Sequence, residues 1–276
     1  MSDLPKHVKV VIIGAGIVGN SVAYHLAKLG WNDMVMIDKG PLPNPGGSTG
    51  HASNFIFPVD HSKVMTQLTL DSMAQYKELG VFRESGGIEL ARKPERMEEL
   101  KHRIASAKAW GIEASLVTPE EVKKLFPWIN TDAIIGGFHS PTVGVVDSLR
   151  AGTMMRDAAK EMGALSVFTH TEITGVDVKD GRVTGLQTAK GNITTDYVVI
   201  CCGVWSPKIA KMAGASMALT PIVHQMIDVG PISEFEHCTQ EIEYPIIRDM
   251  DTYMYEPQVG NNLEIGSYAH KPIIIK

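Results

Sequence analysis

A glycine-rich turn near the N-terminus constrains the fold of this chain more than any other feature. The β-branched run at residues 9–13 leads directly into Gly14-Ala-Gly-Ile-Val-Gly19, and a segment with one apolar helical face follows at residues 20–29. A second apolar run, at residues 34–37, ends at Asp38. The order strand, glycine turn, helix, strand and acid predicts a parallel βαβ unit of the kind that binds a dinucleotide.

Each position of the turn has a physical role in that interpretation. Gly14 permits the tight turn, and Gly16 lets the backbone approach a pyrophosphate. Gly19 lets the helix pack closely against the strand. The amides around Ile17 and Val18 then point at the phosphates, together with the positive end of the helix dipole. We therefore predict these residues as cofactor-binding.

Asp38 stands where a carboxylate accepts hydrogen bonds from an adenosine ribose. An acid at this position disfavours NADP, because it would repel the 2′-phosphate. The βαβ unit by itself leaves FAD and NAD as alternatives.

The next segment, residues 40–54, is rich in glycine, proline, serine and threonine, which excludes a helix or a central strand. A loop directly after the acid-bearing strand would lie along an extended cofactor. Ser48, Thr49 and Gly50 could donate hydrogen bonds to phosphate or flavin oxygens, and His51 offers a nucleophilic imidazole. Composition alone favours a surface loop with a solvated histidine.

Three phrases together resemble one family of flavoproteins. Residues 14–19, Asp38-Lys39-Gly-Pro and Gly46-Gly-Ser-Thr-Gly-His-Ala52 are similar to the N-terminal part of dimethylglycine oxidase and of the dimethylglycine and sarcosine dehydrogenases, which belong to the D-amino-acid-oxidase-like superfamily. The resemblance implies FAD as the cofactor, with Lys39 and Phe55 among the residues that bind it. It also implies a covalent bond from His51 to the flavin 8α-methyl carbon.

The rest of the chain follows the order of elements in that family. Helices are predicted at residues 64–79, 94–109, 147–162 and 206–212, and Thr118 with Glu121 forms a capping box. Strands at residues 172–178, 182–188 and 191–195 predict a β-meander, followed by a separate apolar strand from residue 196. The resemblance implies that the backbone of Ile173 contacts adenine, although an isoleucine serves equally well as core.

The candidate substrate-binding residues lie on two predicted strands, at residues 220–228 and 251–256. Alternation would place Tyr253 on the same face as Tyr255. The resemblance implies that His224 and Tyr253 lie beside the flavin as catalytic residues, whereas without it both would be read as packed core residues. Arg248 could pair with a substrate carboxylate, but a surface ion pair is the more common use of such an arginine.

The predicted fold class is α/β (α+β overall), with two interleaved domains. A Rossmann-like FAD-binding domain comprises residues 1–85 and 145–215, and a mixed-sheet substrate-binding domain comprises residues 86–144 and 216–276. Members of the family continue beyond the point where this chain stops. We therefore expect a C-terminally incomplete enzyme, either a fragment or a subunit that needs a partner.

The resemblance implies oxidative demethylation of a small N-methyl amino acid, dimethylglycine or sarcosine, through hydride transfer to flavin N5 and an iminium intermediate. Water would then release formaldehyde, unless tetrahydrofolate captures the carbon on a module absent from this chain. The alternatives are a flavoenzyme acting on another amine, amino acid or 2-hydroxy acid, and a non-catalytic regulatory or scaffold subunit. The choice between the two substrates, and between oxygen and an electron-transfer flavoprotein as acceptor, stays open.

Composition excludes several other classes. Hydrophobic residues make up 44% and charged residues 21% of a chain with net charge −5, and basic blocks interleaved with aromatic residues are absent, so nucleic acid is not an expected partner. Apolar runs fall far short of the about 20 residues of a membrane helix. Three cysteines give neither a disulfide framework nor a zinc spacing, and no metal is expected. Without a recognisable secretory signal, the expected location is the cytoplasm, or the mitochondrial matrix if a presequence was removed.

Overall fold

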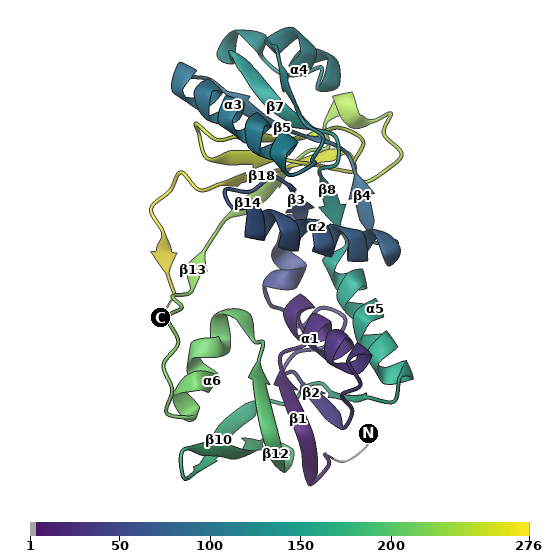
Figure 1. Ribbon diagram of the computed structural model, residues 1–276, viewed down its shortest axis with the longest axis vertical. Helices are drawn as coiled ribbons and strands as arrows, with labels where there is room; N and C mark the ends of the chain where they lie inside the picture. Colours follow the sequence, from purple (N-terminus) through teal and green to yellow (C-terminus); the bar gives the residue numbers. More distant parts are fainter. Residues whose placement is uncertain (1–3, 276) are drawn as a thin grey trace. The chain divides into compact units, whose positions relative to one another are not determined.

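The computed structural model describes residues 4–275 and divides into two compact units, each made from two stretches of the chain (Figure 1). Unit 1 comprises Met1–Ala52 and Asp147–Pro221, and unit 2 comprises Ser53–Val146 and Ile222–Lys276. The mixed α/β class expected from the sequence is confirmed.

The boundaries of the units differ from the predicted domains chiefly at residues 53–85, which the sequence assigned to the first domain. In the structure, β3 (Phe55–Ile56) and β4 (Phe82–Glu84) both pair with β8 (Gly144–Val146). These pairings give residues 53–85 their contacts within unit 2.

Unit 1 is built on a six-stranded sheet in the order β10-β11-β12-β1-β2-β9. The strands β12, β1, β2 and β9 run parallel, and β10 and β11 add an antiparallel meander. The strands are β1 (His7–Ile13), β2 (Met34–Ile37), β9 (Leu165–Phe168), β10 (Ile173–Lys179), β11 (Arg182–Thr188) and β12 (Gly191–Ile200). The helices are α1 (Ile17–Lys28), α5 (Ser148–Glu161) and α6 (Ser206–Met212), with short 3-10 turns at η1 (Ser48–His51) and η3 (Gly203–Trp205).

The strand β12 belongs to both parts of this sheet. Its first residues, Gly191–Thr194, pair with β11, and Thr194–Ile200 pair with β1. The sequence had predicted two strands here, at residues 191–195 and from 196 onward. That prediction is wrong because the chain stays extended through Thr195 and Asp196, after the pairing has passed from β11 to β1 at Thr194.

Both faces of the parallel strands are buried, as expected for a parallel sheet with helices on its faces. One face packs Val10, Ile12 and Met36 with residues of α1 and α5, and the other packs Val11, Ile13 and Ile37 with residues of the meander and α6. The adjacent Cys201 and Cys202 follow β12 and join the two opposite clusters, since neighbouring side chains of an extended chain point to opposite faces. Burial raises the pKa of the Cys201 thiol to about 11, so this cysteine is a neutral core residue at physiological pH.

Unit 2 is built on an eight-stranded mixed sheet in the order β14-β18-β16-β15-β5-β7-β6, with β17 paired to β18. These strands are β5 (Gly87–Ala91), β6 (Ser115–Val117), β7 (Gly136–Ser140), β14 (Met226–Val229), β15 (Ile246–Asp249), β16 (Met254–Glu256), β17 (Gln258–Val259) and β18 (Asn262–Ser267). Two smaller sheets are β3-β8-β4 and a pair formed by β13 (Ile222–Val223) and β19 (Ile273–Ile274). The helices are α2 (Lys63–Glu78), α3 (Pro94–Ala109) and α4 (Pro119–Leu125), with 3-10 turns at η2 (Thr131–Ala133) and η4 (Ser233–Phe235).

Helix boundaries follow the local signals of the sequence. The helix α3 has the predicted bounds and starts with Pro94 in its first turn. Thr118 accepts a hydrogen bond from the Glu121 amide, and the Glu121 carboxylate accepts one from the Thr118 amide, so the predicted capping box is present. Among residues 4–275, none of the helices is long and apolar enough to cross a membrane.

The two predicted substrate-side strands differ from expectation. The segment 220–228 forms two short strands in different sheets, β13 and β14, and His224 lies between them. The segment 251–256 becomes a strand only from Met254, because Asp249 accepts hydrogen bonds from the amides of Asp251 and Thr252 and thereby forms a turn.

Candidate functional site

The glycine turn of unit 1 is built so that its backbone lies against neighbouring backbone. Gly14 has φ +108°, and a Cβ at this position would lie 2.5 Å from the Cys201 carbonyl oxygen. A Cβ on Gly19 would overlap the carbonyl oxygen of Gly14. Side chains larger than hydrogen are therefore excluded at both positions, and the close approach of helix and strand expected at Gly19 is present.

The N-terminus of α1 has no side-chain cap of its own, and one of its first amides is bonded to the neighbouring loop. Gly16 is the N-cap residue and offers no side-chain cap, and the first turn contains no acidic residue. The Ile17 amide donates a hydrogen bond to Thr49 Oγ1 at 3.0 Å, and the Val18 side chain is 59% exposed. The first amides of a helix have no intrahelical acceptor, so this end can donate to an anion.

Asp38 is held rigidly at the end of β2 beside that turn. Its two carboxylate oxygens accept hydrogen bonds from the amides of Ala15 and Gly40, both at 2.7 Å. Each oxygen keeps a further lone pair for a ligand hydroxyl. The adjacent Lys39 places its ammonium 4.2 Å from the centre of the Trp205 ring.

The predicted cofactor loop is anchored by Thr49. Besides the bond from Ile17, the Thr49 carbonyl accepts a hydrogen bond of 2.8 Å from the hydroxyl of Ser148, the first residue of α5. Ser48 starts the 3-10 turn η1, and Gly50 lies so close to the Asn44 side chain that a Cβ would be 2.6 Å from it. The loop therefore has a defined conformation against two helix N-termini.

His51 ends this 3-10 turn with an exposed side chain. Its Nδ1 lies 3.0 Å from the Gly47 carbonyl oxygen, which can only accept a hydrogen bond. Nδ1 must therefore carry the proton, and in the neutral imidazole Nε2 has a free lone pair. This is the tautomer in which Nε2 can act as a nucleophile. We call residues 14–19, 38–40 and 47–51 the glycine-turn region.

A second group of functional side chains lies in unit 2. His224 Nε2 is 3.1 Å from the Tyr255 hydroxyl, and the His224 ring stacks on Tyr268 with 3.9 Å between ring centres and 9° between planes. The Phe55 ring contacts Tyr255 edge to face at 5.0 Å. We call these four residues the histidine–tyrosine cluster.

The position of Tyr255 depends on a glycine on the neighbouring strand. Tyr255 on β16 is paired with Gly266 on β18, and a Cβ on Gly266 would overlap the Tyr255 ring. The ring therefore lies flat over the glycine, with its hydroxyl toward His224. The residue is 3% exposed.

Electrostatics keep this pair of side chains neutral. Desolvation, together with the nearby His270, lowers the pKa of His224 below its ordinary value. Burial raises the pKa of the Tyr255 phenol. At neutral pH the cluster therefore presents an uncharged imidazole, which can accept a proton, next to an uncharged phenol.

The predicted catalytic residue Tyr253 lies elsewhere. It occupies the turn before β16 with φ +58° and is 60% exposed. The prediction that Tyr253 and Tyr255 share one strand face is wrong, because Tyr253 precedes the strand. In the part of the chain that the structure describes, the tyrosine rings that contact His224 are those of Tyr255 and Tyr268.

Comparison with known proteins decides the family. Residues 9–272 match the family described as FAD dependent oxidoreductase, DAO. The chain belongs to this family. It is 30% identical over 283 residues to the mitochondrial sarcosine dehydrogenase of Homo sapiens, an alignment that covers 98% of this chain and 30% of that protein. The resemblance to the sarcosine and dimethylglycine dehydrogenases is thus confirmed.

The chain is also similar to a regulatory subunit and to a solved structure of the same fold. The mitochondrial pyruvate dehydrogenase phosphatase regulatory subunit of Mus musculus is 33% identical over 74% of this chain and 24% of its own length. The crystal structure of L-proline dehydrogenase from P. horikoshii superposes with a TM-score of 0.85 at 28% identity, covering 98% of this chain and 71% of that one. The chain therefore spans less than a third of the length of the two curated relatives, the sarcosine dehydrogenase and the phosphatase regulatory subunit.

The glycine-turn region of the chain fits the cofactor of its family. Gly14 and Gly19 let the turn pack against neighbouring backbone, and the N-terminus of α1 that follows has no side-chain cap and no acidic residue in its first turn, which suits a pyrophosphate. The Asp38 carboxylate suits ribose hydroxyls. These residues would hold FAD, while covalent attachment at His51 stays a prediction.

Two other predicted cofactor residues have clear positions in the structure. Ile173 is the first residue of β10, and its side chain is 4% exposed within the core, so its backbone is what remains for a ligand. Phe55 lies in unit 2, where its ring meets Tyr255. Contact of either residue with FAD stays a prediction.

Sequence reasoning missed Tyr255 and Tyr268 as site residues. The signal for Tyr268 was its place in the phrase Gly266-Ser-Tyr-Ala-His270, which lies within the residues that match the family. The signal for Tyr255 was weaker, because the direction of its side chain depends on the residue at which β16 begins.

Proposed function

We propose that the protein oxidises the N-methyl group of a small N-methyl amino acid, dimethylglycine or sarcosine, with FAD as the oxidant. The observation that carries this proposal is the neutral His224–Tyr255 pair, in which His224 Nε2 lies 3.1 Å from the Tyr255 hydroxyl oxygen. Family membership and the similarity to sarcosine dehydrogenase support the choice of oxidant and of substrate class.

The chemistry requires the substrate amine in its neutral form, because its lone pair stabilises the cation left when the methyl carbon loses a hydride. An N-methyl amino acid arrives mainly as an ammonium ion at neutral pH. His224, with its lowered pKa, is an unprotonated base that can accept the ammonium proton. The Tyr255 hydroxyl orients the imidazole and can hydrogen-bond the substrate nitrogen.

FAD, when bound, accepts the hydride equivalent. The resulting substrate iminium takes up one water molecule and breaks down to the demethylated amine, formaldehyde and a proton. In place of water, tetrahydrofolate could capture the one-carbon unit if a folate-binding module acts with this chain. None of these later steps requires a further side chain of the cluster.

We further propose that His51 carries FAD covalently. The hydrogen bond from Nδ1 to the Gly47 carbonyl leaves Nε2 as the reactive nitrogen, and the anchoring of the loop through Thr49 fixes the ring near the N-terminus of α1. Both features reduce the motion that the imidazole must give up before it bonds to a cofactor.

The test is reduction of the bound flavin without oxygen. We expect the visible absorption of the FAD-loaded protein to bleach when dimethylglycine or sarcosine is added, and His224→Gln to slow this bleaching. Bleaching by other amines or by 2-hydroxy acids alone would contradict the N-methyl assignment.

The absence of bleaching with every substrate class would contradict catalysis altogether. It would favour a non-catalytic subunit, a function suggested by the similarity to the pyruvate dehydrogenase phosphatase regulatory subunit. A separate measurement addresses attachment. After acid precipitation, flavin should stay with wild-type protein and appear in the supernatant for His51→Ala.

A further inference from the structure

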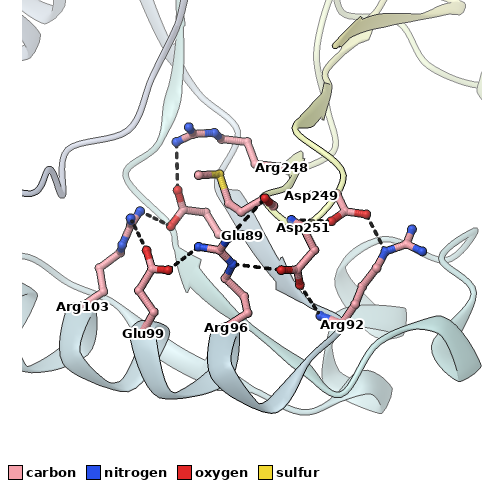
Figure 2. A network of polar contacts seen from close by, with 9 residues as sticks. Glu89, Arg92, Arg96, Glu99, Arg103, Arg248, Asp249 and Asp251 are labelled. Carbon is pink, nitrogen blue, oxygen red and sulfur yellow. Dashed lines mark hydrogen bonds and ion pairs between the residues drawn. The ribbon is translucent and has the colours of Figure 1, made fainter. Parts of the chain in front are cut away.

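Two buried acids of unit 2 are paired with arginines. Arg248 on β15 donates from Nη1 to Glu89 Oε1 at 2.8 Å, and Arg103 from α3 contacts the other oxygen of this fully buried side chain (Figure 2). Arg92 likewise pairs with the buried Asp249. The surface ion pair favoured by the sequence is therefore not the arrangement of Arg248.

These pairs belong to one network in which arginines and acids alternate, shown in Figure 2. Arg103 also meets Glu99, which in turn meets Arg96. Arg96 pairs with Asp251, whose carboxylate accepts a hydrogen bond from the Arg92 amide. Each acid of the network is thus in contact with a cation of the chain, which offsets part of the cost of burying its charge.

Glu264 on β18 is a buried acid of the same sheet that lacks such a partner. The residue is 8% exposed, and its Oε1 is buried without a hydrogen-bond partner among residues 4–275. Burial, and then the Asp228 carboxylate, raise the pKa of Glu264 above its ordinary value. A buried carboxyl without a partner is costly, so its presence calls for an explanation beyond the packing of the sheet.

Strand register places Glu264 beside the histidine–tyrosine cluster. Tyr255 on β16 is paired with Gly266, and Glu264 stands two residues before this glycine on the same strand, so its side chain leaves the sheet on the same face. The Tyr255 ring fills the space that a side chain at Gly266 would take, next to Glu264. Burial is the main cause of the raised pKa of the Tyr255 phenol, and the charge of Glu264 adds to it.

The cluster therefore combines an uncharged base and an uncharged phenol with a carboxyl group that has no cation of its own. We propose that Glu264 binds the positively charged amine end of the substrate, so that the site selects cationic amines over neutral molecules of the same shape. The inference rests on the proposed function for the identity of the substrate, but the cation site can be tested separately.

The contact acts at two stages. The substrate arrives as an ammonium ion, and an opposite charge close to Glu264 favours the ionised form of its carboxyl group. After His224 has accepted the ammonium proton, loss of a hydride turns the neutral amine into an iminium cation, and the same carboxylate stabilises this second positive charge. Because Oε1 is shielded from water, the solvent weakens the attraction less than it would at an exposed carboxylate.

The test compares two ligands of the same shape and different charge. Dimethylsulfonioacetate has the branching of dimethylglycine with a permanent positive charge on sulfur, and 3-methylbutanoate has an uncharged carbon in place of the sulfur. Neither has a neutral amine whose lone pair could support loss of a hydride, so binding is measured without oxidation.

We expect isothermal titration calorimetry of the FAD-loaded full chain, at about pH 8 where His224 is uncharged, to show that wild type prefers the sulfonium. Glu264→Gln should weaken sulfonium binding about tenfold or more, because the opposite charge is gone. The affinity of this variant for 3-methylbutanoate should be unchanged or higher.

Two controls separate recognition from structure. Asp228→Asn removes an exposed acid that is directly paired with Glu264, and it should leave the sulfonium preference as in wild type. Glu264→Gln should unfold in urea at the same concentration as wild type or at a higher one, because a carboxyl group without a partner contributes no pairing that the substitution could remove.

Several outcomes would overturn the inference. These are a wild type that binds both ligands equally or neither of them, a Glu264→Gln variant that keeps the wild-type preference, and an Asp228→Asn variant that loses as much of it as Glu264→Gln does. A marked loss of stability in Glu264→Gln would assign the carboxyl group a structural role and would also overturn it.

Failure of the proposed function is distinguishable from failure of the cation site. A wild type that prefers the sulfonium through Glu264, yet is not bleached by any N-methyl amino acid, would keep the cation site and refute the demethylation. Bleaching by an N-methyl amino acid without any sulfonium preference would keep the demethylation and refute the cation site.

Discussion

The glycine-turn region and the histidine–tyrosine cluster position their polar atoms by opposite means. In the first, main-chain amides and glycines lie against other main chain, and the obstacles to a side chain are the carbonyl groups of Gly14 and Cys201. In the second, side chains from separate strands meet, and the obstacle beside Gly266 is the movable ring of Tyr255. We therefore expect substitutions in the glycine-turn region to disrupt the fold, and substitutions in the histidine–tyrosine cluster to leave the fold intact.

The largest expected effect is that of Gly19→Ala. A Cβ would overlap the carbonyl oxygen of Gly14, and neither the helix nor the strand can yield cheaply. We expect a loss of about 4 kcal/mol in the free energy of unfolding, measured by urea denaturation, with loss of bound flavin. Gly47→Ala is the control, since a Cβ there would meet only the Trp205 ring, at 3.6 Å, and φ is −96°. Equal stability of the two variants would contradict the backbone argument.

Glu89→Gln tests whether the ion pairs of Glu89 with Arg103 and Arg248 stabilise unit 2. The change keeps the size of the side chain but leaves Arg103 and Arg248 without their shared charge in a buried place. We expect a loss of about 3 kcal/mol in the free energy of unfolding. Glu98→Gln removes a fully exposed partner of Lys101 and should cause no measurable change. If both substitutions are neutral, the network does not stabilise the sheet.

Gly266→Ala is the counterpart of Gly19→Ala in the substrate region. Because the Tyr255 ring can rotate away, the expected destabilisation is about 1–2 kcal/mol, smaller than at Gly19. The displaced ring should lose its contact with His224, so kcat/KM should fall more than stability does. A variant that unfolds as readily as Gly19→Ala would remove the distinction between the two regions.

Tyr255→Phe and Tyr253→Phe compare the tyrosine that contacts His224 with the one predicted from sequence. Loss of the Tyr255 hydroxyl removes a hydrogen bond worth about 1 kcal/mol, or about fivefold in kcat/KM. Tyr253 is exposed on its turn and should matter less. Steady-state kinetics of the two variants decide the matter, and a larger effect at Tyr253 would favour the original prediction.

The smallest effect concerns the charge of His224. Desolvation and then His270 lower its pKa, so His270→Ala should move the pKa of His224 upward toward the ordinary value of about 6.5. The unfolded chain takes up the proton first as pH falls, so this histidine makes the folded state less favourable below about pH 6.5. An NMR titration of the imidazole resonances measures the shift. An unchanged or lower pKa in the variant would show that His270 does not act on it.

The same contrast explains how much could be predicted from the sequence. The helix after the glycine turn, the strand before Asp38, the capping box at Thr118 and most other helices depend on residues close together in the chain, and the structure contains them as predicted. Tyr255 depends on the residue at which β16 begins, and that is set by the turn that Asp249 forms with Asp251 and Thr252. A side-chain pattern with period two cannot reveal a turn made by a buried carboxylate.

Long-range pairing was also beyond the sequence. The position of Arg248 over Phe57 and against Glu89 follows from the register of β15 with β5 and from β3, which joins another sheet. The place of residues 53–85 in unit 2 has the same reason, since the pairing of β3 and β4 with β8 is not visible locally.

The strand β12 determines where unit 1 can accept extra residues. Because Gly191–Thr194 pairs with the meander and Thr194–Ile200 with β1, one inserted residue within it would reverse the faces of every side chain that follows. The turn at Asp180–Gly181 lies at the far end of the meander, where both residues have positive φ and Gly181 has open space around it. A reporter peptide inserted there should leave the register of the parallel strands, and with it the glycine turn, undisturbed.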